Sequence, residues 1–450
     1  MTGAPHNGSK GSKGSKGSVG PAGMAGPGAP SLEDVAACVH CGMCLEACPT
    51  YKELRVEGDS PRGRLYLIRG LIEKKLEPSP SVMAHLDRCL DCRACETACP
   101  STVKYGEILE KTRTILQPTR ALTPLAALAR WLAFRVVLPS RAAQTIAFKL
   151  LWLAQVLGLL RLGAALARRR LLPPTLAALA ADPPRVPFRS FRARHAKTVF
   201  PALGTRRLRV ALFTGCVADH LFADVNEATV RVLTENGCDV EILGGERCCG
   251  ALHLHNGARD QAQALARDNV RAFEAGAYDA IVSNAAGCGA ELRHYGALLP
   301  GDAAAAAFGA RVRDVTEVLS ELGLKPPPAT DAPPLRVAYD EPCHLVHAQK
   351  VSEPPKQLLR AIGGLTLVQL DEADSCCGGA GAYFLQQPEL SAKVTARKLD
   401  AIRRSGAEIV ATGNPGCLMQ IGNAARAAGL PLRVAHPIVL LAEAYARRPR

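Results

Sequence analysis

The chain has 450 residues, which is long enough for two or three domains with separate cores. Its net charge is +14, but residues 111–209 alone hold nineteen Lys or Arg residues and one acid, Asp182. The rest of the folded chain is therefore acidic, which argues against the basic surface of a nucleic-acid-binding protein. Every uncharged apolar run is shorter than the roughly eighteen residues of a membrane-spanning helix.

Residues 1–30 are predicted to form a disordered tail, because they consist mainly of Gly, Ser, Lys and Pro and can bury little apolar surface. They lack the apolar segment of a cleavable signal peptide. We therefore expect a cytoplasmic protein. In that compartment, clustered cysteines bind metal more often than they form disulfides.

Residues 31–117 are predicted to form a small helical domain. One helix follows the N-cap Ser31, a second begins near Pro61, and the segment from Ser81 repeats the pattern of a serine cap followed by a helix. Between these helices lie "CVHCGMCLEACP" and "CLDCRACETACP", two copies of the spacing C-x2-C-x2-C-x3-C-P.

This spacing is typical of proteins with two [4Fe–4S] clusters, in which the fourth cysteine of each motif binds the other cluster. The alternative, zinc, is usually held by two pairs of cysteines rather than by three cysteines in seven residues. The sequence therefore predicts two [4Fe–4S] clusters, the first bound by Cys38, Cys41, Cys44 and Cys99 and the second by Cys89, Cys92, Cys95 and Cys48.

Residues 118–208 are predicted to be a basic helical linker. The apolar segment 146–172 is interrupted by Lys149 and Arg161, which favours one or two buried or interfacial helices. With its high positive charge, the linker region is expected to dock on an anionic surface, either membrane lipid or an acidic partner. The alternative is a solvated basic face beside buried helices.

From residue 209 onward, short apolar runs alternate with helical segments, as in a parallel α/β sheet. The pattern C–CCG–C occurs twice, with corresponding cysteines 127 to 129 residues apart. We predict a duplicated α/β domain with pseudo-twofold symmetry, its copies spanning 209–325 and 335–450 with a Pro-rich linker between them. The cysteines follow predicted strands, where α/β folds place their sites. They are Cys216, Cys248, Cys249 and Cys288 in the first copy, and Cys343, Cys376, Cys377 and Cys417 in the second.

These eight cysteines are the candidates for a catalytic or redox role. Four thiols per copy could hold an additional cluster or form a redox disulfide, and inert packing is the third reading. Cys238 lies outside both sets and is predicted to be a buried apolar residue. Four histidines near the cysteines are either proton relays or structural residues, namely His253, His255, His344 and His347.

The motifs "CVHCGMCLEACPTY", "GDSPRGRLYLIRGL", "EPCHLVHAQK" and "TGNPGC" together resemble the glycolate oxidase iron–sulfur subunit family over roughly residues 31–445. This resemblance implies a peripheral membrane complex on the inner face of the cell membrane. In such a complex, FAD-binding subunits oxidise glycolate to glyoxylate and this subunit carries electrons to a quinone or similar acceptor. The CCG copies also resemble the catalytic domain of heterodisulfide reductase. They depart from it because "CGAE" and "CLMQ" lack its final cysteine.

No flavin or dinucleotide fingerprint occurs in this chain. Oxidation of a 2-hydroxy acid releases two electrons, which a flavin must divide between one-electron carriers. A flavin-binding partner is therefore expected. The alternatives are the electron-transfer subunit of a related 2-hydroxy-acid or glycerol-3-phosphate dehydrogenase, and a thiol redox catalyst that acts at the CCG cysteines.

Overall fold

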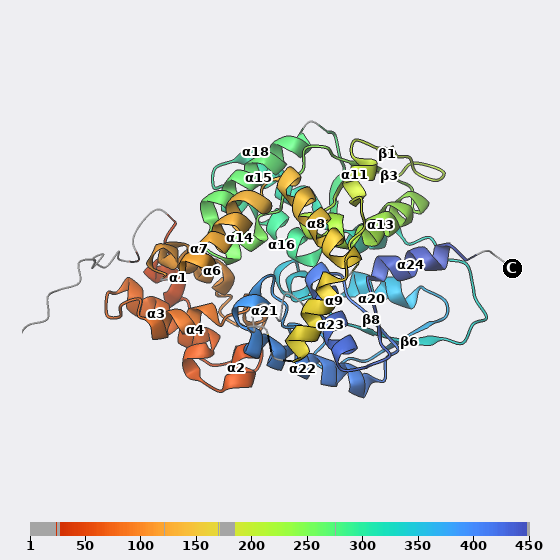
Figure 1. The fold of residues 1–450 in the computed structure, drawn as a ribbon. Coiled ribbons are helices and arrows are strands. Elements are labelled where there is room, and N and C mark those ends of the chain that lie inside the picture. Colours follow the sequence, from red (N-terminus) through yellow and green to blue (C-terminus); the bar gives the residue numbers. More distant parts are fainter. Residues whose placement is uncertain are drawn as a thin grey trace, which may run out of the picture.

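The computed structural model describes Met24 and residues 28–120, 122–169, 171, 185–274 and 276–447. Most of the predicted tail lies outside these residues. The N-terminal domain is helical (Figure 1) and packs around one apolar core that includes Ile68 and Leu109. Its elements are α1 (Leu32–Ala36), α2 (Pro49–Leu54), η1 (Glu57–Asp59), α3 (Pro61–Ile72), α4 (Pro80–Asp87), α5 (Ala94–Thr97), α6 (Tyr105–Leu116) and η2 (Gln117–Thr119).

Local signals set the starts of these helices. Ser31 caps α1 in a reciprocal capping box with Asp34, and Pro61 occupies the first turn of α3, as predicted. The cap predicted at Ser81 is wrong. Ser79 caps α4 instead, because Pro80 needs no backbone donor and takes the first helical position.

The linker forms helices that lie across the near side of the molecule in Figure 1. They are α7 (Pro124–Trp131), the π-helix η3 (Leu132–Val137), α8 (Arg141–Val156), α9 (Leu159–Arg168) and α11 (Phe191–His195). Two separate helices thus account for the described part of the apolar segment 146–172. None of the helices within the described ranges has both the length and the apolarity needed to cross a bilayer.

The first CCG copy contains a five-stranded sheet in the order β1-β3-β2-β4-β5, parallel except for the edge strand β1. β1 comes from the linker region. The strands are β1 (Val199–Phe200), β2 (Leu208–Phe213), β3 (Cys238–Ile242), β4 (Ala280–Ser283) and β5 (Val312–Asp314). The helices are α12 (Cys216–Leu221), α13 (Ala223–Glu235), α14 (Ala251–His255), α15 (Arg259–Glu274), α16 (Ala286–Arg293), α17 (Tyr295–Leu298), α18 (Ala303–Arg311) and α19 (Val315–Leu322).

The second copy repeats this arrangement with a parallel four-stranded sheet in the order β7-β6-β8-β9. Its strands are β6 (Leu335–Tyr339), β7 (Leu365–Val368), β8 (Ile409–Ala411) and β9 (Arg433–Ala435). Its helices are the π-helix η4 (His344–Ala348), α20 (Glu353–Arg360), α21 (Tyr383–Gln386), α22 (Pro388–Ser405), α23 (Pro415–Ala427) and α24 (Pro437–Tyr445). The prediction of a helical ferredoxin-type domain followed by a duplicated α/β domain is confirmed.

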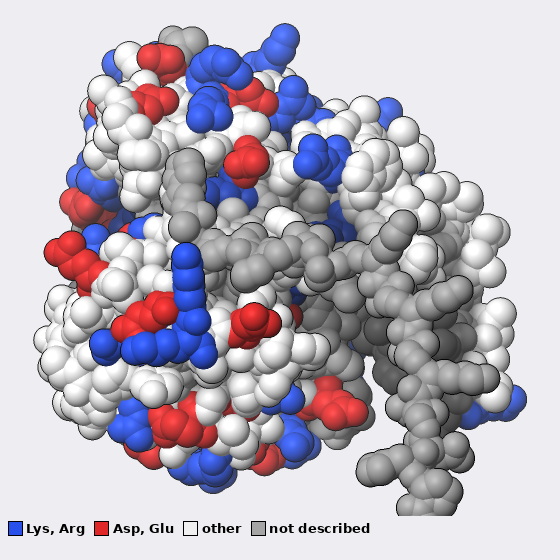
Figure 2. Space-filling view, turned by 90° about the vertical axis from the view of Figure 1, so that its left-hand side faces the viewer, with Lys and Arg blue, Asp and Glu red and all other residues white. Residues whose placement is uncertain are grey.

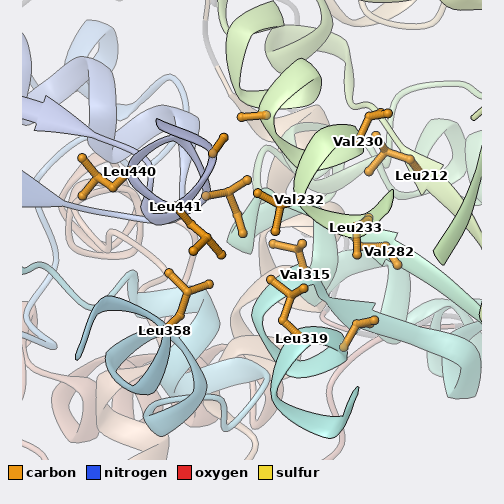
Figure 3. Packing of buried hydrophobic residues seen from close by; sticks show 14 of the residues in the cluster. Leu212, Val230, Val232, Leu233, Val282, Val315, Leu319, Leu358, Leu440 and Leu441 are labelled. Carbon is orange, nitrogen blue, oxygen red and sulfur yellow. The ribbon is translucent and has the colours of Figure 1, made fainter. Parts of the chain in front are cut away.

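The two copies share one apolar core (Figure 3), in which α13 packs against α24 and α19 packs against α20. By their positions relative to the strands, α13 corresponds to α20 and α19 to α24. The two helix contacts are therefore related by the pseudo-twofold symmetry. Val232, Leu319, Leu358 and Leu441 are at most 4% exposed in this interface. The copies are thus held together by hydrophobic burial and form one body.

His436 links the two copies at the edge of this core. Its Nδ1 accepts a hydrogen bond from the backbone of Ile438 (3.1 Å), and its Nε2–H donates to the carbonyl of Asn284 in the first copy (2.9 Å). Burial lowers the pKa of His436 to about 4, and protonation of Nδ1 would remove the cap of α24.

We expect the protein to lose stability between pH 7.5 and pH 5 through His436. An unfolded histidine has a pKa of about 6.5, so the unfolded state binds a proton first as the pH falls. The free energy of unfolding should therefore drop by about 2 kcal/mol over this interval. Urea unfolding at the two pH values measures the drop. In His436→Asn the drop in the free energy of unfolding between pH 7.5 and pH 5 should be smaller by about 2 kcal/mol. A drop as large as in the wild type would contradict the assignment to His436.

Candidate metal centres

Four cysteines from both motifs line one buried cavity of the N-terminal domain: Cys48, Cys89, Cys92 and Cys95. Cys48 is the N-cap residue of α2, while the other three lie in or just before α5. The fourth cysteine of the first motif thus lies beside the first three cysteines of the second, the arrangement that a crossed two-cluster site requires.

The surroundings of this cavity suit an anionic cluster. Cys89 Sγ accepts hydrogen bonds from the backbone N–H of Asp91 (3.4 Å) and from the hydroxyl of Tyr105 (3.5 Å), contacts that stabilise a metal-bound thiolate. Burial raises the pKa values of Cys92 and Cys95 well above their usual range, so without a metal these thiols would stay protonated.

Arg64 is a residue of this site that the sequence analysis missed. Its side chain is fully buried and lines the cavity, and one of its nitrogens, Nη1, has no hydrogen-bond partner. Nε donates to the carbonyl of His85 and Nη2 to Thr50 Oγ1, which fixes the guanidinium in place. A buried cation with an unpartnered nitrogen fits the negative charge of a thiolate-bound cluster.

The other four cysteines of the motifs, Cys38, Cys41, Cys44 and Cys99, lie closer to the surface. Cys41 is exposed, and the remaining three are half-buried against the domain core. Burial raises the pKa of the Cys44 thiol to about 11. Their common ligation of one cluster stays a prediction.

The cysteines of the first CCG copy follow three parallel strands, β2, β3 and β4, as predicted. Cys216 opens α12, Cys248 and Cys249 occupy the loop after β3, and Cys288 lies in α16. The Cys216 and Cys248 Sγ atoms are 3.7 Å apart. A hydrogen bond to Cys248 and burial raise the pKa of Cys216.

A buried cation accompanies this first set. Arg192 pairs with Asp219 (3.2 Å) and with Glu246 (3.4 Å), and Glu246 accepts from the backbone of Thr214 and Gly215. Arg192 thus offsets part of the charge of the two carboxylates, and the loop before Cys216 is held against the loop before Cys248.

The second copy repeats this geometry after β6, β7 and β8. The Cys377 and Cys417 Sγ atoms are 3.2 Å apart, and the ring nitrogen Nδ1 of His344 lies 3.5 Å from Cys343 Sγ. Hydrogen bonds from Cys376, and then from His344, lower the pKa of Cys343. Hydrogen bonds from Cys376 and Cys417 do the same for Cys377.

Here the buried cation is Lys398, whose ammonium pairs with Asp340 (2.9 Å) and donates to the carbonyls of Glu372 and Ala373. It lies close enough to Cys377 to help lower the pKa of that thiol. In both copies, therefore, a buried cation–carboxylate pair stands beside four thiols, although the residues that form it differ.

The glycines after the two CC pairs have corresponding conformations. Gly250 and Gly378 have φ values of +92° and +89°, which other residues rarely adopt. A Cβ on Gly378 would also lie 2.8 Å from the carbonyl oxygen of Ser391. The predicted relief of crowding after the cysteine pair is confirmed for this backbone turn.

The two CCG sites approach each other across the copy interface. The backbone N–H of Gly287 donates to Asn414 Oδ1 (3.2 Å), while the amide nitrogen of Asn414 lies 3.5 Å from Cys417 Sγ. Gly287 directly precedes Cys288. A single side chain therefore connects the last cysteine of one set with the residue before the last cysteine of the other.

Only the second copy places cysteines against the cavity of the N-terminal domain, among the described residues. Cys92 and Cys376 belong to one continuous packed cluster, and Cys343 packs against it. Next to this contact, the hydroxyl of Tyr383 donates a hydrogen bond to the carbonyl of Arg88 (2.7 Å). The hydroxyl oxygen of Thr97 lies 3.0 Å from Nδ1 of His347.

Three of the four predicted histidines are held by structural contacts. His347 also contacts the carbonyl of Asp374, and His253 contacts that of Phe134. His255 lies between Asp91 (3.1 Å) and Glu110 (3.0 Å) of the N-terminal domain. His344 alone lies beside a cysteine thiol, Cys343.

The group Asp91, Glu110 and His255 has the spacing of a metal site, with its ligand atoms within 4.8 Å of one another. Arg93 pairs with Glu110 (3.1 Å), and Arg113 lies 3.9 Å from Asp91. With these cations already present, the group is better described as an ion-pair network that joins the N-terminal domain to the first copy.

Cys238, the cysteine outside all sets, is fully buried in strand β3. The prediction of an apolar packing role is confirmed.

Comparison with known families agrees with this architecture. The family model described as a 4Fe-4S dicluster domain matches residues 34–103, and the model described as a cysteine-rich domain matches residues 210–293 and 337–422. The chain is 38% identical to the probable glycolate oxidase iron-sulfur subunit of Bacillus subtilis, a match that covers 90% of this chain and 93% of that relative.

Two further relatives show the range of similarity. The glycolate oxidase iron-sulfur subunit of Escherichia coli is 36% identical, over 87% of this chain and 90% of the relative. The lactate utilization protein A of an Exiguobacterium species is 30% identical, over 52% of this chain and 97% of the relative. On these matches and on its domain order, the chain belongs to the family of glycolate oxidase iron–sulfur subunits.

Proposed function

We propose that this chain is the electron-transfer subunit of a complex that oxidises glycolate to glyoxylate. A partner flavoprotein removes two electrons from glycolate, and this chain takes them one at a time and passes them to a quinone or similar acceptor. Iron–sulfur clusters, when bound, accept and release one electron each. The two ferredoxin-type cysteine sets would hold two [4Fe–4S] clusters.

The observation that carries this proposal is the continuity of thiol sites through the chain. The half-buried set around Cys38 faces the surface, where a donor can approach, and the cavity set is buried behind it. Cys92 of the cavity set then packs against Cys376, and Asn414 joins the second CCG set to the first. Short steps between buried centres are what an electron carrier needs.

The chain's own residues support this role without any contact to substrate. Buried cations lie beside three of the cysteine sets, each paired with a carboxylate: Arg64 with Asp59, Lys398 with Asp340 and Arg192 with Asp219 and Glu246. The cation of such a pair favours negative charge on a nearby thiol, as Lys398 does for Cys377. The described residues hold no flavin fingerprint, so hydride chemistry is assigned to the partner.

The test is anaerobic mixing of glycolate with this chain, with and without its flavoprotein partner. We expect glycolate to bleach the cluster absorbance only when the partner is present. Bleaching without the partner, or its absence in the complete complex, would refute the proposal. Because a lactate utilization protein is among the relatives, lactate serves as the competing substrate in the same assay.

We also propose that α7, α8 and α9 dock on an anionic membrane surface. Their exposed apolar side chains include Leu125 (77%) on α7, and Ile146, Leu150 and Leu153 at helical spacing on α8. Arg161 and Arg169 lie on or just after α9 in the same region, and neither has an ion pair within the described residues. Apolar side chains among basic ones are typical of helices that lie in the membrane interface.

The face of the molecule on the left of Figure 1 is less suited to this role. Figure 2 shows the side of the molecule on the left of Figure 1, where basic and acidic side chains are interspersed. Several cations of the linker region are also already paired, such as Arg120 with Asp87 and Arg194 with Glu227. The positive charge available to attract anionic lipid is therefore smaller than the number of Lys and Arg residues in segment 111–209 suggests.

We expect the protein to sediment with vesicles that contain anionic lipid and to dissociate as salt rises, because each basic residue near the surface contributes about 1 kcal/mol. Replacing Ile146 and Leu150 with serine should weaken binding at least about tenfold, since each buries apolar surface in the interface. Leu335→Ser, an exposed leucine on β6, is the control and should bind normally. Binding that is insensitive to salt would contradict the electrostatic contribution.

A further inference from the structure

A second cavity lies beside the first CCG copy, between α8 and the segment that leads into α11. Its volume is about 240 Å³. His220 of α12 contributes to its wall, one helical turn after Cys216. The wall of the cavity therefore lies one helical turn from a cysteine of the first set. Its described lining residues are Thr145, Phe148, Lys149, Pro187, Phe188, Arg189, Ser190, Ala193 and His220.

The pseudo-twofold symmetry relates this cavity to the contact through which the second copy meets the N-terminal domain. His220 follows Cys216 by four residues, and His347 follows Cys343 by four. His347 contacts Thr97, which lies between the predicted cluster ligands Cys95 and Cys99. At the equivalent place in the first copy, α8 covers α12 and leaves a cavity. The second copy thus contacts the N-terminal domain at this place, while the first copy has a cavity at the equivalent place.

The chemistry of the walls favours an aromatic ligand that gains negative charge. Phe148 stacks on His220 with ring centroids 4.3 Å apart, and Trp152 meets Phe188 edge-on at 5.0 Å. Lys149 Nζ lies 5.4 Å from the centre of the Phe188 ring, and Arg189 is a second cation of the lining. No acidic residue is among the described lining residues. Asp219 lies behind His220 and is paired with Arg192.

We propose that this cavity binds the electron acceptor, a quinone whose ring contacts Phe148 and Phe188 and whose oxygens are bound by Lys149 and Arg189. An apolar quinone tail would continue along the exposed residues Ile146 and Leu150 of α8. The role of the bound quinone as electron acceptor rests on the proposed electron-transfer function. The binding of a quinone in this cavity is inferred from the lining residues alone.

The overall reaction combines the oxidation of glycolate with the reduction of the quinone, each a change of two electrons and two protons. Glycolate loses two electrons and two protons to become glyoxylate. The electrons pass singly through the cysteine centres, and the quinone takes both of them together with two protons from water, so that each C=O becomes a C–OH of the quinol. Cations beside the ring oxygens stabilise the negative charge that arrives before the protons do.

Tryptophan fluorescence tests the site directly, because the chain has only two tryptophans, Trp131 and Trp152. In the full-length protein with Trp131→Phe, Trp152 is the single reporter beside the cavity. Duroquinone is the probe, since its four methyl groups prevent addition of thiols to the ring. We expect saturable quenching of Trp152. In the matched Trp152→Phe protein, Trp131 on α7 should show only linear, collisional quenching.

Lys149→Gln in the same background should raise the apparent Kd for duroquinone about tenfold, the effect of losing one charge-assisted contact. Lys393→Gln, which removes an equal charge from the exposed face of α22 in the second copy, should leave it unchanged. Linear quenching of both tryptophans, or equal effects of the two substitutions, would overturn the binding site.

Reoxidation then tests the role of the site. Protein reduced with dithionite is mixed with subsaturating duroquinone, and the return of cluster absorbance is followed. We expect Lys149→Gln to slow this step about tenfold and Lys393→Gln to leave it unchanged. An unaltered rate in Lys149→Gln would mean that electrons leave elsewhere. If instead glycolate with the partner never reduces the clusters, the proposed function fails while the quenching result stands.

Discussion

Replacing Cys48 with serine is expected to remove the second cluster and leave the first, so that iron falls from about eight to about four atoms per chain. Cys48 belongs by sequence to the first motif, yet it lines the same cavity as Cys89, Cys92 and Cys95. Its side chain is buried, with Sγ 3.3 Å from Thr50 Oγ1 and 3.8 Å from the carbonyl oxygen of Asp59.

Three companion variants make this test decisive. Under crossed ligation, Cys48→Ser and Cys92→Ser lose the same cluster and leave the same residual electron paramagnetic resonance spectrum. Cys99→Ser should instead match Cys41→Ser, although Cys99 lies more than fifty residues from that motif. If Cys99→Ser lost the cluster of the Cys89–Cys95 motif alone, the crossed assignment would be wrong.

The positions of the cysteines that would bind the clusters could be predicted from sequence because the pattern is local. Three cysteines spaced two residues apart, followed by a fourth and a proline, restrict the backbone whatever the rest of the chain does. The places of the CCG cysteines could also be predicted, because a short apolar run followed by a turn indicates the carboxyl end of a parallel strand, where α/β folds form their sites. Helix starts at Ser31 and Pro61 follow the same local rules.

Features that depend on contacts between distant segments could not be predicted in this way. Arg64 reaches the cavity only because α3 packs beside the loop of Cys89, and "SPRGR" alone does not show which arginine turns inward. The buried cations Arg192 and Lys398 occupy unrelated positions in the two copies, so the repeat gives no signal for them.

Which of the two CCG copies packs against the ferredoxin-type domain is a second feature of this kind. The copies have matched cysteine spacings, and nothing in either motif says which of them contacts the ferredoxin-type domain. That choice depends on packing between Cys92 and Cys376, and on pairs such as Lys52 with Glu372, 320 residues apart in sequence. Such long-range pairs are visible only in the folded chain.

Cys343→Ser is expected to remove electron-accepting capacity that the wild-type chain has beyond its two ferredoxin-type clusters. Cys343 packs beside Cys92 and contacts Cys376 and His344, so it stands where electrons would enter the second CCG set. Anaerobic reductive titration measures this capacity. The wild type should take up more than two electrons per chain, and Cys343→Ser should lose at least one of the additional electrons, with the cluster signals of the N-terminal domain unchanged.

Cys238→Ala supplies the control for this titration, because Cys238 is buried in β3 outside both sets, and it should take up as many electrons as the wild type. Iron counting with thiol titration then identifies the centre. More than eight irons per chain would indicate an additional cluster, and eight irons with a reducible disulfide would indicate thiol redox chemistry. Of seventeen cysteines, nine lie outside the two motifs. If all nine were reduced and unreactive and the wild type took up only two electrons, the CCG cysteines would have a structural role alone.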